Sequence, residues 1–119
     1  GSSIAKMMMA DKKTEAASDE DLKENTKADN SRLSKFLDSL DVYDYDYKDQ
    51  KHGKGRQTSV MAQDLEKSEI GKKAIRETPE GKMVDYAKLL PEMLAANVSS
   101  HKRIMKLEDA LKAKRKGKK

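Results

Sequence analysis

Hydrophobic positions along the chain follow different periods in successive stretches, and each period predicts one kind of element. From Asp29, the apolar residues fall at i, i+3, i+4 and i+7, as on one face of a helix: Leu33, Phe36, Leu37 and Leu40. Over residues 42–48, alternate positions are apolar in the manner of a strand: Tyr43, Tyr45 and Tyr47. Residues 57–63 alternate in the same way. Together the two strands predict a hairpin with a long, glycine-containing turn.

The second half of the chain carries two further helical patterns. Residues 64–75 predict a short helix interrupted at Gly71, and the sequence from Thr78 to Gly81 predicts a turn. A long helix is expected from Leu89 or Leu90 to about Lys114. Proline at position 91 suits its first turn, because an amide there would have no partner within the helix.

A heptad pattern marks one seam of the long helix. Its positions alternate in steps of four and three residues: Met93, Asn97, Ser100, Ile104, Leu107 and Leu111. Such a seam favours association with copies of the same helix, and a polar residue such as Asn97 suits a position that sets the register. Packing of the helix onto its own domain is the alternative interpretation.

Composition limits how much of this chain can be buried. Hydrophobic residues make up 35% of the 119 residues and charged residues 39%, which is a poor supply for a self-contained core. We therefore expect one α+β domain, in which the helix with Leu33 to Leu40 packs on the hairpin and the long helix associates with copies of itself. Its parts are a leader over residues 1–17, a body over residues 18–88, and the helix with a basic tail over residues 89–119.

Several kinds of chemistry are excluded or disfavoured. The absence of cysteine excludes disulfides and thiolate sites. His52 and His101 stand alone, so no metal site is expected. The basic tail lacks the aromatic residues that stack on bases, so specific nucleic-acid binding is not expected. No apolar run is long enough to cross a bilayer, and we expect the tyrosine stripe to pack in the core rather than bind a ligand.

One short motif carries a family resemblance. Residues 18–25 read Ser-Asp-Glu-Asp-Leu-Lys-Glu-Asn, and this segment resembles the Ser-Asp-Glu-x-Leu-Lys-Glu-Asn motif that opens the endosialidase-type chaperone domains. Residues 42–47, 60–66 and 84–91 continue the similarity, with Gln-Asp at 63–64 where many members have Gln-Glu. The chain thus resembles the self-cleaving C-terminal chaperone domain of phage tail fibres, tailspikes and neck appendages.

The resemblance implies a function and a site. It implies a homotrimeric intramolecular chaperone, assembled through a helical bundle or coiled coil, that registers the upstream fibre chain in the host cytoplasm during virion assembly. It also implies a serine-lysine dyad that cuts the chain once and releases the domain, with Ser18 as nucleophile and Lys23 as general base. No cofactor, metal, membrane or specific nucleic acid is implied.

The scissile bond and the role of the serine each have an alternative. Attack on the preceding carbonyl favours the bond between Ala17 and Ser18, and the bond between Ser18 and Asp19 stays open. Five positions separate Ser18 from Lys23, so the pair requires a bend near Glu20. In the other interpretation, Ser18 only caps a helix, and the chain is a non-catalytic trimerisation or adaptor module.

Overall fold

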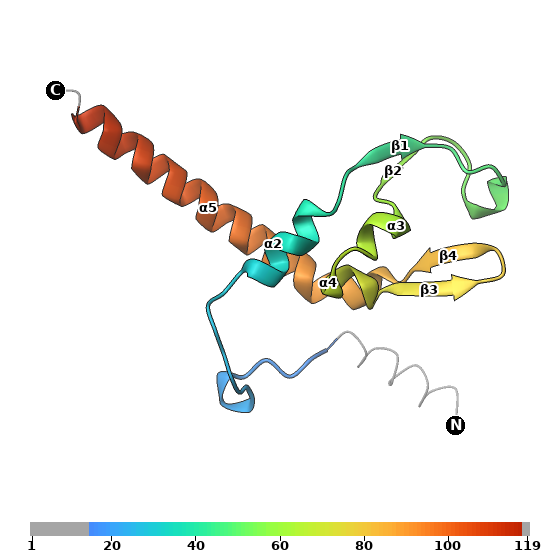
Figure 1. Ribbon diagram of the computed structural model, residues 1–119, viewed down its shortest axis with the longest axis horizontal. Coiled ribbons are helices and arrows are strands. Elements are labelled where there is room, and N and C mark those ends of the chain that lie inside the picture. Colours follow the sequence, from blue (N-terminus) through green and yellow to red (C-terminus); the bar gives the residue numbers. More distant parts are fainter. Residues whose placement is uncertain (1–14, 118–119) are drawn as a thin grey trace.

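The computed structural model describes residues 15–117. It has an α+β fold of two small antiparallel sheets and a long C-terminal helix, which confirms the predicted class. Figure 1 shows both hairpins projecting to one side of the body, while α5 projects to the other. The elements are η1 (Glu20–Leu22), α2 (Ser31–Asp38), β1 (Tyr43–Tyr45), η2 (Gln50–His52), β2 (Gln57–Ser59), α3 (Ala62–Leu65), α4 (Glu69–Lys72), β3 (Ile75–Thr78), β4 (Gly81–Val84), η3 (Tyr86–Leu89) and α5 (Leu90–Gly117).

The predicted leader and the extreme C-terminus lie mostly beyond this description. Residues 1–14 and 118–119 are outside the described residues, so the expected leader is represented only by residues 15–17. Residues 15–32 are all exposed, and residues 15–30 run outside the body as far as α2 (Figure 1). The core therefore begins at α2.

Helix α2 forms where the apolar period predicts it and supplies one wall of a small core. The carboxylate of Asp29 accepts a hydrogen bond from the backbone amide of Ser31 at 2.9 Å, which fixes the start of the helix. The same hydrogen bond lowers the pKa of Asp29. The side chains of α2 that point inward join the rest of the buried cluster: Leu33, Phe36, Leu65, Ile70, Ala74 and Leu89.

The first hairpin is present but shorter than predicted. Strands β1 and β2 pair antiparallel, with Tyr43 opposite Ser59 and Tyr45 opposite Gln57. After Ser59 the chain leaves the sheet, because the residues from Ala62 onward form the short helix α3. The expected strand over residues 57–63 therefore covers a strand and the start of a helix.

The tyrosines of this hairpin do not lie in the core, so that prediction is wrong. Tyr43 and Tyr47 are 41% and 39% exposed. Only three residues of each strand are paired, and the hairpin projects away from α2 and α4 (Figure 1). The rings of Tyr45 and Tyr47 instead contact each other edge to face, with centroids 5.3 Å apart.

The helical stretch after β2 breaks before Gly71 and not at it. Residues 66–68 separate α3 from α4, and the hydroxyl of Ser68 caps α4 by accepting from the amide of Gly71 at 3.1 Å. Gly71 is buried within α4, and a Cβ added there would collide with the backbone carbonyl of Leu65. The glycine thus permits close approach of two short helices.

A second hairpin follows, of which the sequence predicted only the turn. Strands β3 and β4 pair from Ile75 opposite Val84 to Thr78 opposite Gly81, which leaves a two-residue loop. The loop is stabilised by the hydroxyl of Thr78, which donates to the carbonyl of Gly81 at 2.7 Å. Gly81 has φ +124°, a backbone conformation that favours glycine.

Helix α5 begins at Leu90, as the position of the proline predicts. Leu89 just before it is buried and anchors the helix to the body. An ion pair between Lys73, beside α4, and Glu92 in the first turn of α5 adds a second attachment. Across residues 15–117, no helix is long and apolar enough to cross a membrane.

We predict that Gly71→Ala destabilises the body, because the new methyl group displaces the backbone of Leu65. Overpacking of this kind costs about 1–3 kcal/mol. Chemical denaturation at a fixed protein concentration measures it. Gly117→Ala is the control, since a Cβ there meets nothing within 4 Å. Equal stability of the two variants would contradict the close approach.

Candidate functional site

The motif segment brings its serine and lysine together. The ammonium of Lys23 donates a hydrogen bond to the hydroxyl of Ser18, with Nζ and Oγ 3.1 Å apart. The 3-10 turn η1 lies between them, which is the bend that the five-residue separation requires. Both side chains are exposed. The two atoms are therefore within the reach of direct proton transfer.

Asp19, and not Ser18, caps the turn. The carboxylate of Asp19 accepts a hydrogen bond from the amide of Asp21 at 3.0 Å, in the geometry expected of a capping residue. The hydroxyl of Ser18 makes its contact with Lys23 instead. This arrangement gives no support to the interpretation of Ser18 as a helix cap.

The residues around the expected scissile bonds are accessible. Ala17, Ser18 and Asp19 are all exposed, and the chain before the turn is irregular. Beyond the turn, Asn25 has φ 54°, in the left-handed region. Asparagine tolerates that region better than most residues, so its place at the end of the motif has a backbone reason that sequence reasoning missed.

The seam predicted on α5 is exposed in the single chain. No residue of α5 is buried, and all those from residue 100 to 117 are exposed. The four apolar seam residues have large exposed fractions: Met93 50%, Ile104 55%, Leu107 66% and Leu111 55%. The polar seam residues Asn97 and Ser100 are exposed as well. Three apolar side chains beside the seam, which the heptad analysis missed, share this exposure: Leu94, Val98 and Met105.

An apolar hollow lies where α2, β2 and the first turns of α5 meet. It has a volume of about 380 Å³ and is lined mainly by apolar side chains. Two seam residues, Met93 and Asn97, belong to this lining, together with Phe36 and Leu40 of the body side. The exposed surface of α5 is thus continuous with an apolar surface of the body.

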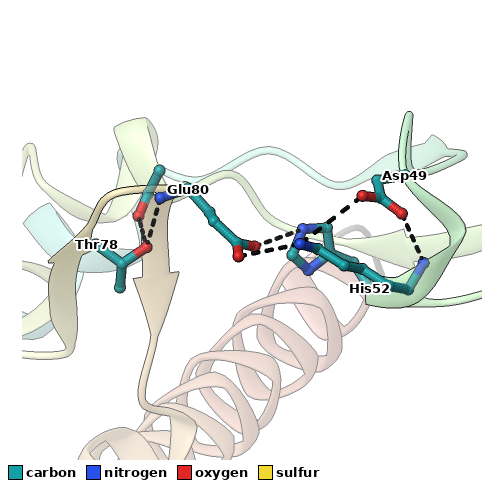
Figure 2. Close-up of polar contacts among 6 residues, drawn as sticks. Asp49, His52, Thr78 and Glu80 are labelled. Atoms are coloured by element: carbon teal, nitrogen blue, oxygen red, sulfur yellow. Dashed lines mark hydrogen bonds and ion pairs between the residues drawn. The ribbon is translucent and has the colours of Figure 1, made fainter.

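The tips of the two hairpins are joined by a polar cluster around Glu80. One carboxylate oxygen of Glu80 lies 3.0 Å from the ammonium of Lys51, and the other lies 3.4 Å from Nε2 of His52. Figure 2 shows the Glu80 side chain directed from the second hairpin toward His52, with Asp49 beyond it. Asp49 caps η2 by accepting from the amide of Lys51 at 3.0 Å. The cluster therefore fixes how the hairpins lie relative to each other.

A hollow of about 430 Å³ lies between the hairpins behind this cluster. Its lining includes Tyr45, Tyr47 and Tyr86. A hydrogen bond with Tyr47 raises the pKa of Tyr45 to about 12. Lys82 of β4 also lines this hollow and pairs with Glu66 and Glu77, and hydrogen bonds to these carboxylates raise the pKa of Lys82.

Candidate metal ligands do not gather within the described part of the chain. Among residues 15–117, no group of three or more histidine, cysteine, aspartate or glutamate side chains could hold a metal ion.

Comparison with known proteins identifies the family. Residues 18–76 match the family model described as chaperone of endosialidase, Peptidase_S74. The matched segment, about half of the chain, begins at the serine of the motif and includes both hydrogen-bonded side chains. No curated protein and no solved structure matches the chain. Residues 18–76 belong to the chaperone-of-endosialidase family, as the motif indicated, and α5 lies outside the matched segment.

The polar cluster at the hairpin tips gives a prediction for Glu80→Gln. Loss of the carboxylate charge weakens the contacts with Lys51 and His52, so amide hydrogen exchange of η2 should rise by about two- to fivefold. The melting temperature should hardly change, because exposed ion pairs contribute little to global stability. Glu108→Gln on α5 is the matched control. Identical exchange of η2 in both variants would show that the cluster does not hold the tips.

Proposed function

We propose that this chain is an intramolecular chaperone that assembles as a homotrimer through α5, registers an upstream phage fibre or spike chain, and cuts itself off beside Ser18. The family match supports the chaperone class and a peptidase role. The observation that carries the proposal is the 3.1 Å contact between the Ser18 hydroxyl and the Lys23 amine at the start of that match.

The two side chains suit the roles of nucleophile and general base. A serine hydroxyl attacks a carbonyl efficiently only when a neighbouring base removes its proton, and Lys23 is within hydrogen-bond reach. The lysine must first lose its own extra proton. Both groups are exposed in the single chain, and water favours the charged ammonium. Covering the pair with another subunit would favour the neutral amine, so assembly would activate the base.

The proposed cleavage has two steps. Neutral Lys23 takes the hydroxyl proton while Oγ of Ser18 attacks the carbonyl carbon of Ala17, and the bond from that carbon to the Ser18 nitrogen then breaks. The nitrogen receives the proton, and the Ala17 carbonyl is held as an ester on Oγ. Water hydrolyses the ester to a carboxylate and restores the hydroxyl. Cleavage after Ser18 is the alternative to this scheme. The masses of the fragments distinguish the two scissile bonds.

The exposed surface of α5 supports association as the first event. An isolated helix with many charges and no tertiary contact is marginal in water, yet α5 continues far beyond its last contacts with the body (Figure 1). Association along the seam would cover Ile104, Leu107 and Leu111. At its N-terminal end, the same contact would extend to the apolar hollow through Met93 and Asn97.

Such an assembly explains how a chaperone of this size acts. Holding three upstream chains together raises their effective concentration and removes part of the entropic barrier to nucleating an intertwined stalk. Cleavage afterwards makes the process one-way, because the folded stalk then persists through its own unfolding barrier. The site of action would be the host cytoplasm during virion assembly, with the domain absent from the mature fibre. The upstream chain is the substrate, and no cofactor is required.

Cleavage is tested by placing a reporter protein ahead of Gly1 and following the masses of the expressed products. We expect a C-terminal fragment that begins at Ser18, or at Asp19 if the second bond is cut. Ser18→Ala and Lys23→Ala should each lower the cleavage rate by about a thousandfold or more, because nucleophile and base act as a unit.

Lys27→Ala is the matched control for the base, because Lys27 is a lysine in the same exposed stretch. It should cleave like the wild type. A fragment of the same mass in Ser18→Ala, or a wild-type chain that stays intact as a trimer, contradicts the catalytic part of the proposal.

Assembly is tested by truncating the seam. In the double variant Ile104→Ala, Leu107→Ala, each chain loses about 2 kcal/mol or more of apolar contact. The concentration at which the trimer dissociates should rise at least tenfold, as analytical ultracentrifugation measures. The control is Lys106→Ala, Asp109→Ala on the same helix. A wild-type monomer at all concentrations, or equal weakening by both pairs, contradicts assembly through the seam.

A further inference from the structure

The segment that carries Ser18 and Lys23 is not held by the core. Every residue from 15 to 32 is exposed, and even the one large apolar side chain of the turn, Leu22, is 69% exposed. Burial therefore contributes nothing to the meeting of the serine and the lysine. Local hydrogen bonds have to bring the two side chains together.

The distance to be closed is large for a segment of this length. Five residues of extended chain span about 17 Å, whereas Oγ of Ser18 and Nζ of Lys23 are 3.1 Å apart. On a regular helix, residues three or four apart face each other, and residues five apart do not. A tight turn between the two residues is therefore a precondition of their contact.

Asp19 contributes to that turn with both its backbone and its side chain. Its carbonyl accepts a hydrogen bond from the amide of Leu22 at 3.0 Å, and its carboxylate accepts from the amide of Asp21 at 3.0 Å. The two other acids of the turn, Glu20 and Asp21, are exposed, and neither supplies the cap. Lys23 follows in an extended conformation that closes the turn, with its amide donating to the carbonyl of Glu20.

We propose that Asp19 is a positioning residue for the Ser18–Lys23 pair: its carboxylate holds the turn that brings the amine to the hydroxyl. This inference rests on the proposed cleavage for its consequence and on the turn geometry for its cause. In this role the carboxylate oxygen of Asp19 matters as a hydrogen-bond acceptor, and its negative charge does not contribute. A charge beside Lys23 would favour the protonated ammonium and so oppose the base.

Two substitutions separate the acceptor from the charge. Asp19→Asn keeps an oxygen that caps almost as well as a carboxylate, whereas Asp19→Ala removes it. Misplacement of a reacting group by about 1 Å can cost about a hundredfold in rate. We expect Asp19→Asn to cleave within about threefold of the wild-type rate and Asp19→Ala to cleave at least about tenfold more slowly.

The experiment measures the rate of reporter release as a function of pH for the wild type, both Asp19 variants and the control Asp21→Ala. The trimer mass of each protein is measured alongside, to separate positioning from assembly. A positioning role lowers the maximum rate of Asp19→Ala and leaves the pH midpoint in place. A charge role shifts the midpoint in both Asp19 variants. Either an Asn variant as slow as the Ala variant, or an Ala variant at the wild-type rate, overturns the inference.

A second measurement does not depend on cleavage. In the Ser18→Ala background, amide hydrogen exchange at Asp21 and Leu22 reports the turn directly. Asp19→Ala should accelerate exchange at both amides, and Asp19→Asn should not. If the wild-type chain proves not to cleave, the proposed function fails while this measurement still decides the inference. Unchanged exchange in Asp19→Ala overturns it.

Discussion

Among residues 15–117, no segment covers the apolar side chains in the outer half of α5, and this lack of core-forming partners governs the rest of the described structure. The buried cluster is built from a handful of side chains supplied by α2, the two short helices and the residue just before α5. It anchors one end of the long helix at Leu89 and leaves Ile104, Leu107 and Leu111 exposed. Charged residues outnumber hydrophobic ones in this sequence, at 39% against 35%, which leaves few apolar side chains for further burial. In the proposed assembly, partner subunits would cover these side chains.

The small core also does not include the residues of the candidate site. The serine and lysine meet on a segment that is exposed throughout, so their contact depends on one capped turn and not on burial. A serine hydroxyl becomes an efficient nucleophile only when a neighbouring base accepts its proton. In the proposed function, assembly would cover this site and so activate the pair.

The two hairpins play a different part from the helix. Each is too short to be stable alone, and their tips are joined by Glu80 of one hairpin and Lys51 and His52 of the other (Figure 2). Exposed contacts of this kind set orientation more than stability. The body is thus a small core with the long helix α5 on one side and the two linked hairpins on the other (Figure 1).

Local pattern determined the elements, and tertiary contacts determined their ends and their surroundings. The apolar period of α2, the start of α5 beside its proline, and the first hairpin followed from sequence, because each depends on side chains a few residues apart. The motif also indicated the family and the Ser18–Lys23 pair. The sequence missed the β3–β4 hairpin, placed the helix break at Gly71, and put the tyrosines in the core. Those features depend on which surfaces meet: Gly71 faces the backbone of Leu65, and the tyrosines project past a core too small to reach them. Contacts between distant segments decide such matters, and a linear pattern does not contain them.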